Sequence, residues 1–166
     1  MLLARDRIGI KPLYYSTINS IFVFSSEIRS ILSLPWVRAE LNEAEFYHFL
    51  SFNFTSPPET LFKGIYKFHP GHKMVIDKSG INLYEPYWNL EVPGNNDLSE
   101  QRYIIKLRNE FEKSIKYRMV SDVPIGAFIS GGVDSSAVVA NMSSGSCKSI
   151  NTFSVAFEDC EDFNEL

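Results

Sequence analysis

The feature that most constrains the fold is a glycine pair that joins an apolar run to a helical pattern. Residues 123–129 are apolar and short enough for a buried strand, and the string Ser-Gly-Gly-Val-Asp-Ser-Ser follows at 130–136. A short helix is predicted around Ala137–Ala140, and residues 151–157 favour the next strand. Two strands around a glycine turn and a helix, within roughly thirty residues, predict a βαβ unit with a right-handed crossover and a parallel sheet.

The same string carries candidate chemistry. Gly131 and Gly132 let the backbone turn tightly and approach a ligand, and amides at a helix start can cradle a phosphate. Asp134 would repel a phosphate unless a cation lies between them, so we expect Mg²⁺ to bridge the two. The alternative is a capped turn, in which the glycines serve geometry and Asp134 and Ser135 act as caps.

The string lacks the G-K-[ST] ending of a Walker A loop. It resembles the pyrophosphate loop, S-G-G-x-D-S, of N-type ATP pyrophosphatases. Members of that superfamily adenylate a carboxyl or carbonyl oxygen and release pyrophosphate.

Five further stretches narrow the resemblance to the glutamine-dependent asparagine synthetase family. They resemble, in order along the chain, R-D-R-x-G-x-K-P-L-Y-Y, S-S-E-x-K/R, L-x-P-G-H, S-D-V-P-x-G and F-S-x-x-F of that family. Here these motifs lie at 5–15, 25–29, 67–72, 121–126 and 153–157.

The resemblance implies a chain of mixed α/β and α+β class in two parts. Residues 1–88 would be the C-terminal part of a class II glutamine amidotransferase domain, a partial αββα fold of the N-terminal-nucleophile type. Residues 99–166 would begin a doubly wound parallel-sheet ATP-pyrophosphatase domain. The polar stretch 89–98, with Pro-Gly-Asn-Asn at its centre, is the predicted linker.

The resemblance also implies the binding residues. ATP phosphates and magnesium would be bound by Ser130, Gly131, Gly132, Asp134, Ser135 and Ser136. Ile129 and Val155 match positions that hold the adenosine part through backbone groups, which adjacent parallel strands present at one crevice. From the residues alone, both positions favour a plain core role.

The implied function is ATP-driven adenylation of aspartate, followed by amide transfer of glutamine-derived ammonia. The alternatives are a related amidotransferase with another acceptor, such as a surface sugar acid or a β-lactam precursor, and a catalytically dead nucleotide-binding remnant. The family's glutaminase uses an N-terminal cysteine, whereas residues 1 and 2 here are Met and Leu. No catalytic residue is therefore assigned, and this chain alone is expected to hydrolyse no glutamine and to make no asparagine.

Composition excludes several other classes. A formal net charge of -4 argues against a nucleic-acid binder. The sequence contains no apolar run of about 18 residues, so no membrane span is predicted. Charged residues in the first seven positions argue against a signal peptide, so a cytoplasmic protein is expected. Strands with unpaired edges are expected to pair with another chain, either in a homodimer or with a complementary fragment. His48, His69 and His72 favour turn and packing roles over metal binding.

Local patterns predict the remaining elements. Asn19-Ser20 is expected to join two strands as a hairpin, and residues 73–77 and 81–84 to form another strand pair. Asn42 with Glu45, and Asp97 with Glu100, are predicted capping boxes for two helices. The second helix would bury one stripe, made of Ile104, Leu107, Phe111 and Ile115.

Overall fold

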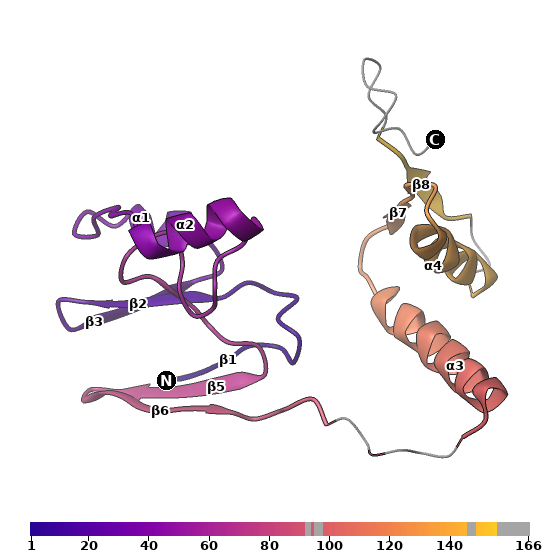
Figure 1. Cartoon of the computed structure of the whole chain (residues 1–166), viewed down its shortest axis with the longest axis horizontal. Coiled ribbons are helices and arrows are strands. Elements are labelled where there is room, and N and C mark those ends of the chain that lie inside the picture. The colour runs from indigo at the N-terminus through magenta and orange to yellow at the C-terminus, as the bar shows by residue number, and fades with distance from the viewer. Residues whose placement is uncertain (92–93, 95–97, 146–148, 156–166) are drawn as a thin grey trace. The chain divides into compact units, whose positions relative to one another are not determined.

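The computed structural model describes residues 1–91, 94, 98–145 and 149–155. These residues fall into two compact units, Met1–Val92 and Pro93–Leu166, and each is described by itself (Figure 1). Part of the predicted linker, residues 92–93 and 95–97, lies outside the described residues. The domain boundaries at 88 and 99 remain predictions.

The first sheet of unit Met1–Val92 is antiparallel, with strand order β1-β5-β6. Its strands are β1 (Leu2–Ala4), β5 (His72–Asp77) and β6 (Gly80–Pro86). Asp77 pairs with Gly80 across the turn, so the strand pair predicted from the pattern is confirmed.

The second sheet has the order β3-β2-β4, with β2 (Tyr14–Ile18), β3 (Ile21–Ser25) and β4 (Tyr66–Lys67). Ile18 pairs with Ile21, and the two residues between them, Asn19 and Ser20, have φ of 50° and 63°. A two-residue hairpin loop needs positive φ at both positions when its turn is of type I′. The predicted hairpin is therefore confirmed.

The two sheets pack against each other through one hydrophobic cluster. Its buried members are Leu3 of β1, Met74 and Ile76 of β5, and Phe68, and partly buried side chains from both sheets pack around them. Tyr15 of β2 links the two sheets, because its ring lies 6.2 Å from that of Tyr84 of β6. This cluster is the core of the unit.

Two helices belong to the same unit. Helix α1 (Ile28–Leu32) packs on β3 and β2, and its Ile31 is buried. Helix α2 (Glu43–Phe52) buries none of its residues and ends at Asn53, whose φ is 59°.

The predicted capping box of α2 is wrong, although Asn42 is the N-cap residue. The Asn42 side chain makes no cap hydrogen bond and instead donates from Nδ2 to Glu59 Oε2 at 3.3 Å. Glu45 Oε2 accepts from the Ser56 amide at 2.8 Å. Both side chains therefore hold the segment after the helix, a tertiary use that a local pattern does not reveal.

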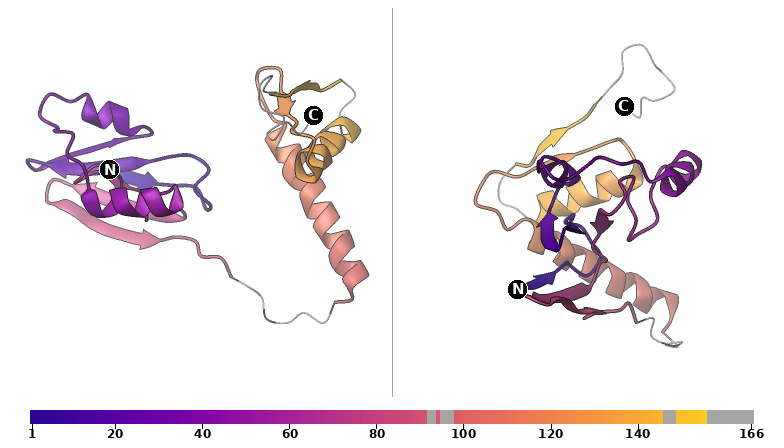
Figure 2. Two further views of the ribbon diagram at one scale, coloured as in Figure 1. Left: turned by 45° about the horizontal axis from the view of Figure 1, so that its top comes forward. Right: turned by 90° about the vertical axis from the view of Figure 1, so that its left-hand side faces the viewer.

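Unit Pro93–Leu166 contains α3 (Glu100–Arg118), β7 (Gly126–Phe128), α4 (Val133–Ser144) and β8 (Asn151–Phe153). β7 and β8 pair in parallel, which confirms the βαβ unit. The first strand is shorter than the predicted 123–129, because Pro124 has no amide for a sheet ladder. Figure 2 shows the four elements from two further sides.

Helix α3 differs from the prediction at its start and along its face. Ser99 is its N-cap residue and makes no side-chain cap bond, and Asp97 lies outside the described residues. Only Ile115 of the predicted stripe is buried, whereas Leu107 is 72% exposed. In the part of the chain described, no helix has the length and apolar character needed to cross a membrane.

Candidate functional site

The predicted binding residues gather at the carboxyl ends of β7 and β8. The Ile129 amide donates to the Phe153 carbonyl at 2.9 Å, which continues the ladder one residue past the end of β7. Parallel strands present their carboxyl ends at one edge of a sheet, so Val155 lies at the same edge as the loop that begins at Ser130. The exposed fraction of Val155 is 69%, so the described residues do not bury it as a core position.

Ser135 organises the loop from within. Its hydroxyl accepts from the Ser130 amide at 3.3 Å and donates to the Gly132 carbonyl at 3.1 Å. A hydroxyl has one proton, so a Ser135 that keeps this bond has none left for a ligand. Gly131 has φ of 81°, a conformation that favours glycine. The loop is therefore preformed by its own hydrogen bonds.

The backbone amides of the loop point to anion binding. Gly132 is the N-cap of α4, and the first helical bond runs from the Ser136 amide to the Gly132 carbonyl at 3.1 Å. Across the described residues, the amides of positions 131–135 have no hydrogen-bond partner. Free amides at a helix start carry partial positive charge and are a ready site for phosphate.

Asp134 lies in the first turn of α4 and is exposed. An acidic side chain in the first turn interacts favourably with the helix dipole and so stabilises the helix, which is the simplest structural role for Asp134. Within the described residues, no three acidic, histidine or cysteine side chains lie close enough to hold a metal. One carboxylate beside an amide cradle suits Mg²⁺, which usually shares its oxygen ligands between a carboxylate and substrate phosphates.

Ser154 is a member of this site that sequence reasoning missed. Its hydroxyl donates to the Ile129 carbonyl at 2.8 Å, so the end of β8 is tied to the residue that opens the loop. The F-S-x-x-F motif contains this serine, but only the sheet register places it opposite Ile129.

The Arg5–Lys11 loop of unit Met1–Val92 is held by side chains. Arg5 is 6% exposed, and its guanidinium donates to the carbonyls of Lys11, Phe68 and Gly9 at 2.7, 2.5 and 2.8 Å. The Asp6 carboxylate accepts from the amides of Lys11 and Ile10, and these bonds lower the pKa of Asp6. The motif thus fixes a turn.

Two of the histidines lie close to this loop. The Tyr84 hydroxyl accepts from the His69 backbone amide at 2.9 Å and also lies 2.8 Å from Nδ1 of the His69 ring. Burial, then His72 and Arg5, lower the pKa of His69. His72 Nδ1 donates to the Pro70 carbonyl at 2.7 Å. The turn and packing roles predicted for these histidines are confirmed.

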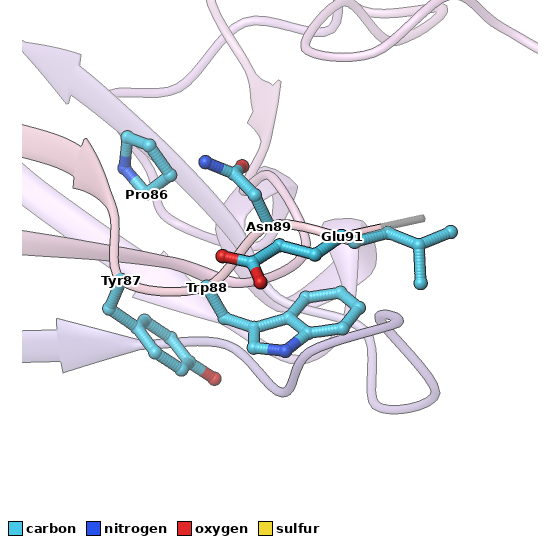
Figure 3. A pocket seen from close by; sticks show the side chains of 6 residues that line it. Pro86, Tyr87, Trp88, Asn89 and Glu91 are labelled. Atoms are coloured by element: carbon cyan, nitrogen blue, oxygen red, sulfur yellow. The ribbon is translucent and has the colours of Figure 1, made fainter. Parts of the chain in front are cut away.

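A surface hollow of about 580 Å³ lies after β6, lined by the consecutive residues 86–91 (Figure 3). Tyr87, one of the lining residues, donates from its hydroxyl to the Arg5 carbonyl at 2.7 Å. The Arg7 guanidinium lies 6.0 Å from the ring of Trp88. No predicted binding residue lines this hollow, so we assign it no chemistry.

Comparison with known proteins finds one family match in each unit. Residues 1–88 match the glutamine amidotransferase domain family, and residues 106–166 match the asparagine synthase family. Asparagine synthetase (glutamine-hydrolyzing) 3 of Bacillus subtilis is 36% identical over 138 residues, which are 82% of this chain and 22% of that protein. Asparagine synthetase (glutamine-hydrolyzing) 1 of the same organism is 35% identical over 164 residues, 98% of this chain and 25% of that protein.

An amidase, chyE of Penicillium rubens, is 30% identical over 145 residues, 83% of this chain and 20% of that protein. The chain thus spans a quarter or less of the length of these relatives. Both family matches occur in one chain, and asparagine synthetases align with most of it. The chain therefore belongs to the asparagine synthetase family, with residues of the glutamine amidotransferase domain ahead of residues of the synthase domain.

Proposed function

We propose that this chain is part of a glutamine-dependent asparagine synthetase and that its loop 130–136 binds the phosphates of ATP. The observation that carries the proposal is the row of free amides at 131–135, on a preformed loop between a parallel strand and a helix. These amides offer positive charge where the phosphates of a nucleotide would lie.

In the proposed reaction, a carboxylate oxygen of aspartate attacks the α-phosphorus of ATP, and pyrophosphate leaves. Ammonia from glutamine then attacks the activated carbonyl carbon, and AMP leaves. Adenylation is needed because a carboxylate oxygen is itself a poor leaving group. The loop amides would stabilise the charge of the departing pyrophosphate, and Mg²⁺ held beside Asp134 would neutralise part of it.

The other binding residues follow from the same proposal. Ser130 and Ser136 are exposed and would donate to phosphate oxygens, while Ser135 holds the loop. Ile129 and Val155 would meet the adenosine part through backbone groups. Residues 1–88 would belong to an αββα glutaminase, and residues 99–166 would open a doubly wound sheet.

A second candidate differs only in the acceptor. The amidase relative aligns with 83% of this chain at 30% identity, so similarity over this region extends to a protein that is not named an asparagine synthetase. An amidotransferase acting on another acid, such as a surface sugar acid or a β-lactam precursor, would use the same phosphate loop. A remnant that binds nucleotide without catalysis would also keep it. Assays of AMP release with aspartate and with other carboxylic acids separate the acceptors.

Calorimetric titration of Mg-ATP into the 166-residue chain tests the site. Asp134→Ala is expected to weaken Mg-ATP binding about tenfold, because it removes a carboxylate from the magnesium. Asp122→Ala is the matched control, since Asp122 is an exposed aspartate of the same unit outside the loop. With EDTA present, the Asp134 variant should bind ATP no more weakly than the unaltered chain. Absence of Mg-ATP binding by the unaltered chain would refute the proposal.

Two further expectations remain predictions. The 166-residue chain should hydrolyse no glutamine by itself, and measurable release of glutamate by the purified chain would show this to be wrong. Pairing with a second copy or with a complementary fragment would appear as a mass above 19.0 kDa in sedimentation.

A further inference from the structure

The hydrogen-bond ladder between β7 and β8 ends in an unusual way. Neighbouring parallel strands exchange evenly spaced bonds, in which one residue donates to one partner and accepts from the residue two positions later. The Ile129 amide donates to the Phe153 carbonyl at 2.9 Å. In this register, the next bond would run from the Val155 amide to the Ile129 carbonyl.

A side chain makes that bond instead. The Ser154 hydroxyl donates to the Ile129 carbonyl at 2.8 Å. Among the residues that the structure describes, the Val155 amide has no partner, and Val155 is 69% exposed. The Ile129 carbonyl has a second lone pair and can still accept another bond. An open donor and an open acceptor therefore end the ladder, beside the phosphate loop.

We infer that Ser154 is a positioning residue that keeps the Val155 amide free to donate to the base of the bound nucleotide. The inference rests on the proposed ATP site and adds its base selectivity. The Watson–Crick edge of adenine offers an acceptor at N1 and a donor at its amino group. That edge complements a free amide beside a carbonyl. Guanine presents a donor at N1 and an acceptor beside it, so it meets the same two groups with the opposite pattern.

The hydroxyl matters because of what would replace its bond. Without it, the Ile129 carbonyl would lose its donor, and the Val155 amide is the group that the register offers in exchange. The ladder would then extend by one bond and consume the donor that the base needs. Phosphate binding would not change, because the amides of 131–135 and the Ser130–Ser135 contact do not involve Ser154.

The test compares three ligands, Mg-ATP, Mg-GTP and Mg-tripolyphosphate, by calorimetry on the 166-residue chain. Ser154→Ala should weaken Mg-ATP about tenfold, the effect of one hydrogen bond, and leave Mg-tripolyphosphate unchanged. The preference for Mg-ATP over Mg-GTP should fall by a similar factor. Ser154→Thr, which keeps a hydroxyl, should restore both values.

Thr152→Ala is the matched control. It removes another hydroxyl from β8, one that makes no hydrogen bond within the described part of the chain, and it should leave all three affinities unchanged. If Ser154→Ala does not fold, Ser154→Val compared with Ser154→Thr isolates the hydroxyl at constant shape.

Equal weakening of Mg-ATP and Mg-tripolyphosphate would mean that Ser154 only supports the loop, and the inference would be overturned. Unchanged Mg-ATP affinity in Ser154→Ala would overturn it too. If the unaltered chain bound Mg-tripolyphosphate as tightly as Mg-ATP, the phosphate loop would stand and base recognition would fall. If the unaltered chain bound neither Mg-ATP nor Mg-tripolyphosphate, the proposed function itself would be refuted.

Discussion

The Arg5–Lys11 loop and the Ser130–Ser136 loop are both polar and contain glycine, but they differ in whether side chains satisfy their backbone groups. In the first, Arg5 is 6% exposed, and its guanidinium donates to three carbonyls from two stretches of chain. In the second, hydroxyls fix the turn while the amides of 131–135 stay open within the described structure. Open amides at the start of a helix carry partial positive charge, so a row of them on a preformed loop is suited to bind an anion.

Burial follows the same division. Among the described residues, the core of unit Met1–Val92 includes Leu3, Phe68 and Met74, whereas unit Pro93–Leu166 buries only Ile115 and Met142. The Arg5–Lys11 motif and the Ser130–Ser136 motif thus have different structural roles. One stabilises a turn between sheets, and the other presents backbone charge to solvent.

The largest expected effect comes from Arg5→Met. The change leaves three carbonyls without their donor and should lower the free energy of unfolding by about 3 kcal/mol. Arg38→Met, at an exposed arginine of the same unit, should change it by less than about 0.5 kcal/mol. Urea unfolding followed by circular dichroism measures both. A loss below about 1 kcal/mol for Arg5→Met would show that the loop does not depend on this cation.

Next in size is the binding loss from Gly131→Ala. A Cβ at φ of 81° is strained, so the loop should shift and Mg-ATP affinity should fall about tenfold. Gly64→Ala is the control, because Gly64 has φ of 73° in unit Met1–Val92 and a Cβ there meets nothing within 4 Å. Calorimetry should find its Mg-ATP affinity unchanged. Equal affinity losses in both variants would contradict a local role for the loop.

The pH response of His69 should be smaller. Its pKa in the folded chain lies below the ordinary value of 6.5, so below that pH the unfolded chain binds more protons. Stability should therefore fall as pH drops from 7 through 6.5 toward the lowered pKa. Thermal unfolding of His69→Gln should show a flatter dependence of stability on pH between pH 7 and about 5. Parallel curves for His69→Gln and the unaltered chain would refute the assignment.

The smallest effect is expected on the face of α3. Leu107 is 72% exposed, so Leu107→Gln should change the unfolding free energy by less than about 0.5 kcal/mol. Ile115→Ala, at the buried position of the same helix, should lower it by about 2 kcal/mol or more. A loss above about 1 kcal/mol for Leu107→Gln, measured in urea, would mean that something covers this face.

Sequence patterns predicted the elements whose causes are local. The hairpin at Asn19-Ser20 and the order strand, glycine loop, helix and strand at 126–153 follow from neighbouring residues, and both are confirmed. Within the candidate site, the string 130–136 could be read directly, because the turn and the amides belong to one short segment. What these residues bind remains a prediction.

Patterns failed where a partner lies far along the chain. Glu45 fits a capping box with Asn42 but bonds to Ser56, eleven positions away. The contact between Arg5 and Phe68 spans 63 positions, and no spacing rule reveals it. Ser154 and Ile129 meet only through the register of β7 and β8. The stripe of α3 was a sound amphipathic pattern, but burial depends on a covering surface that periodicity cannot supply.

The contact between Arg7 and Trp88 has a practical consequence for optical work on this chain. The two tryptophans, Trp36 and Trp88, both belong to unit Met1–Val92, and the remaining residues from Pro93 onward contain none. Because the Arg7 guanidinium lies 6.0 Å from the Trp88 ring, indole emission should respond when the Arg5–Lys11 loop opens. Fluorescence thus offers a built-in probe of one unit, free of intrinsic tryptophan signal from the other.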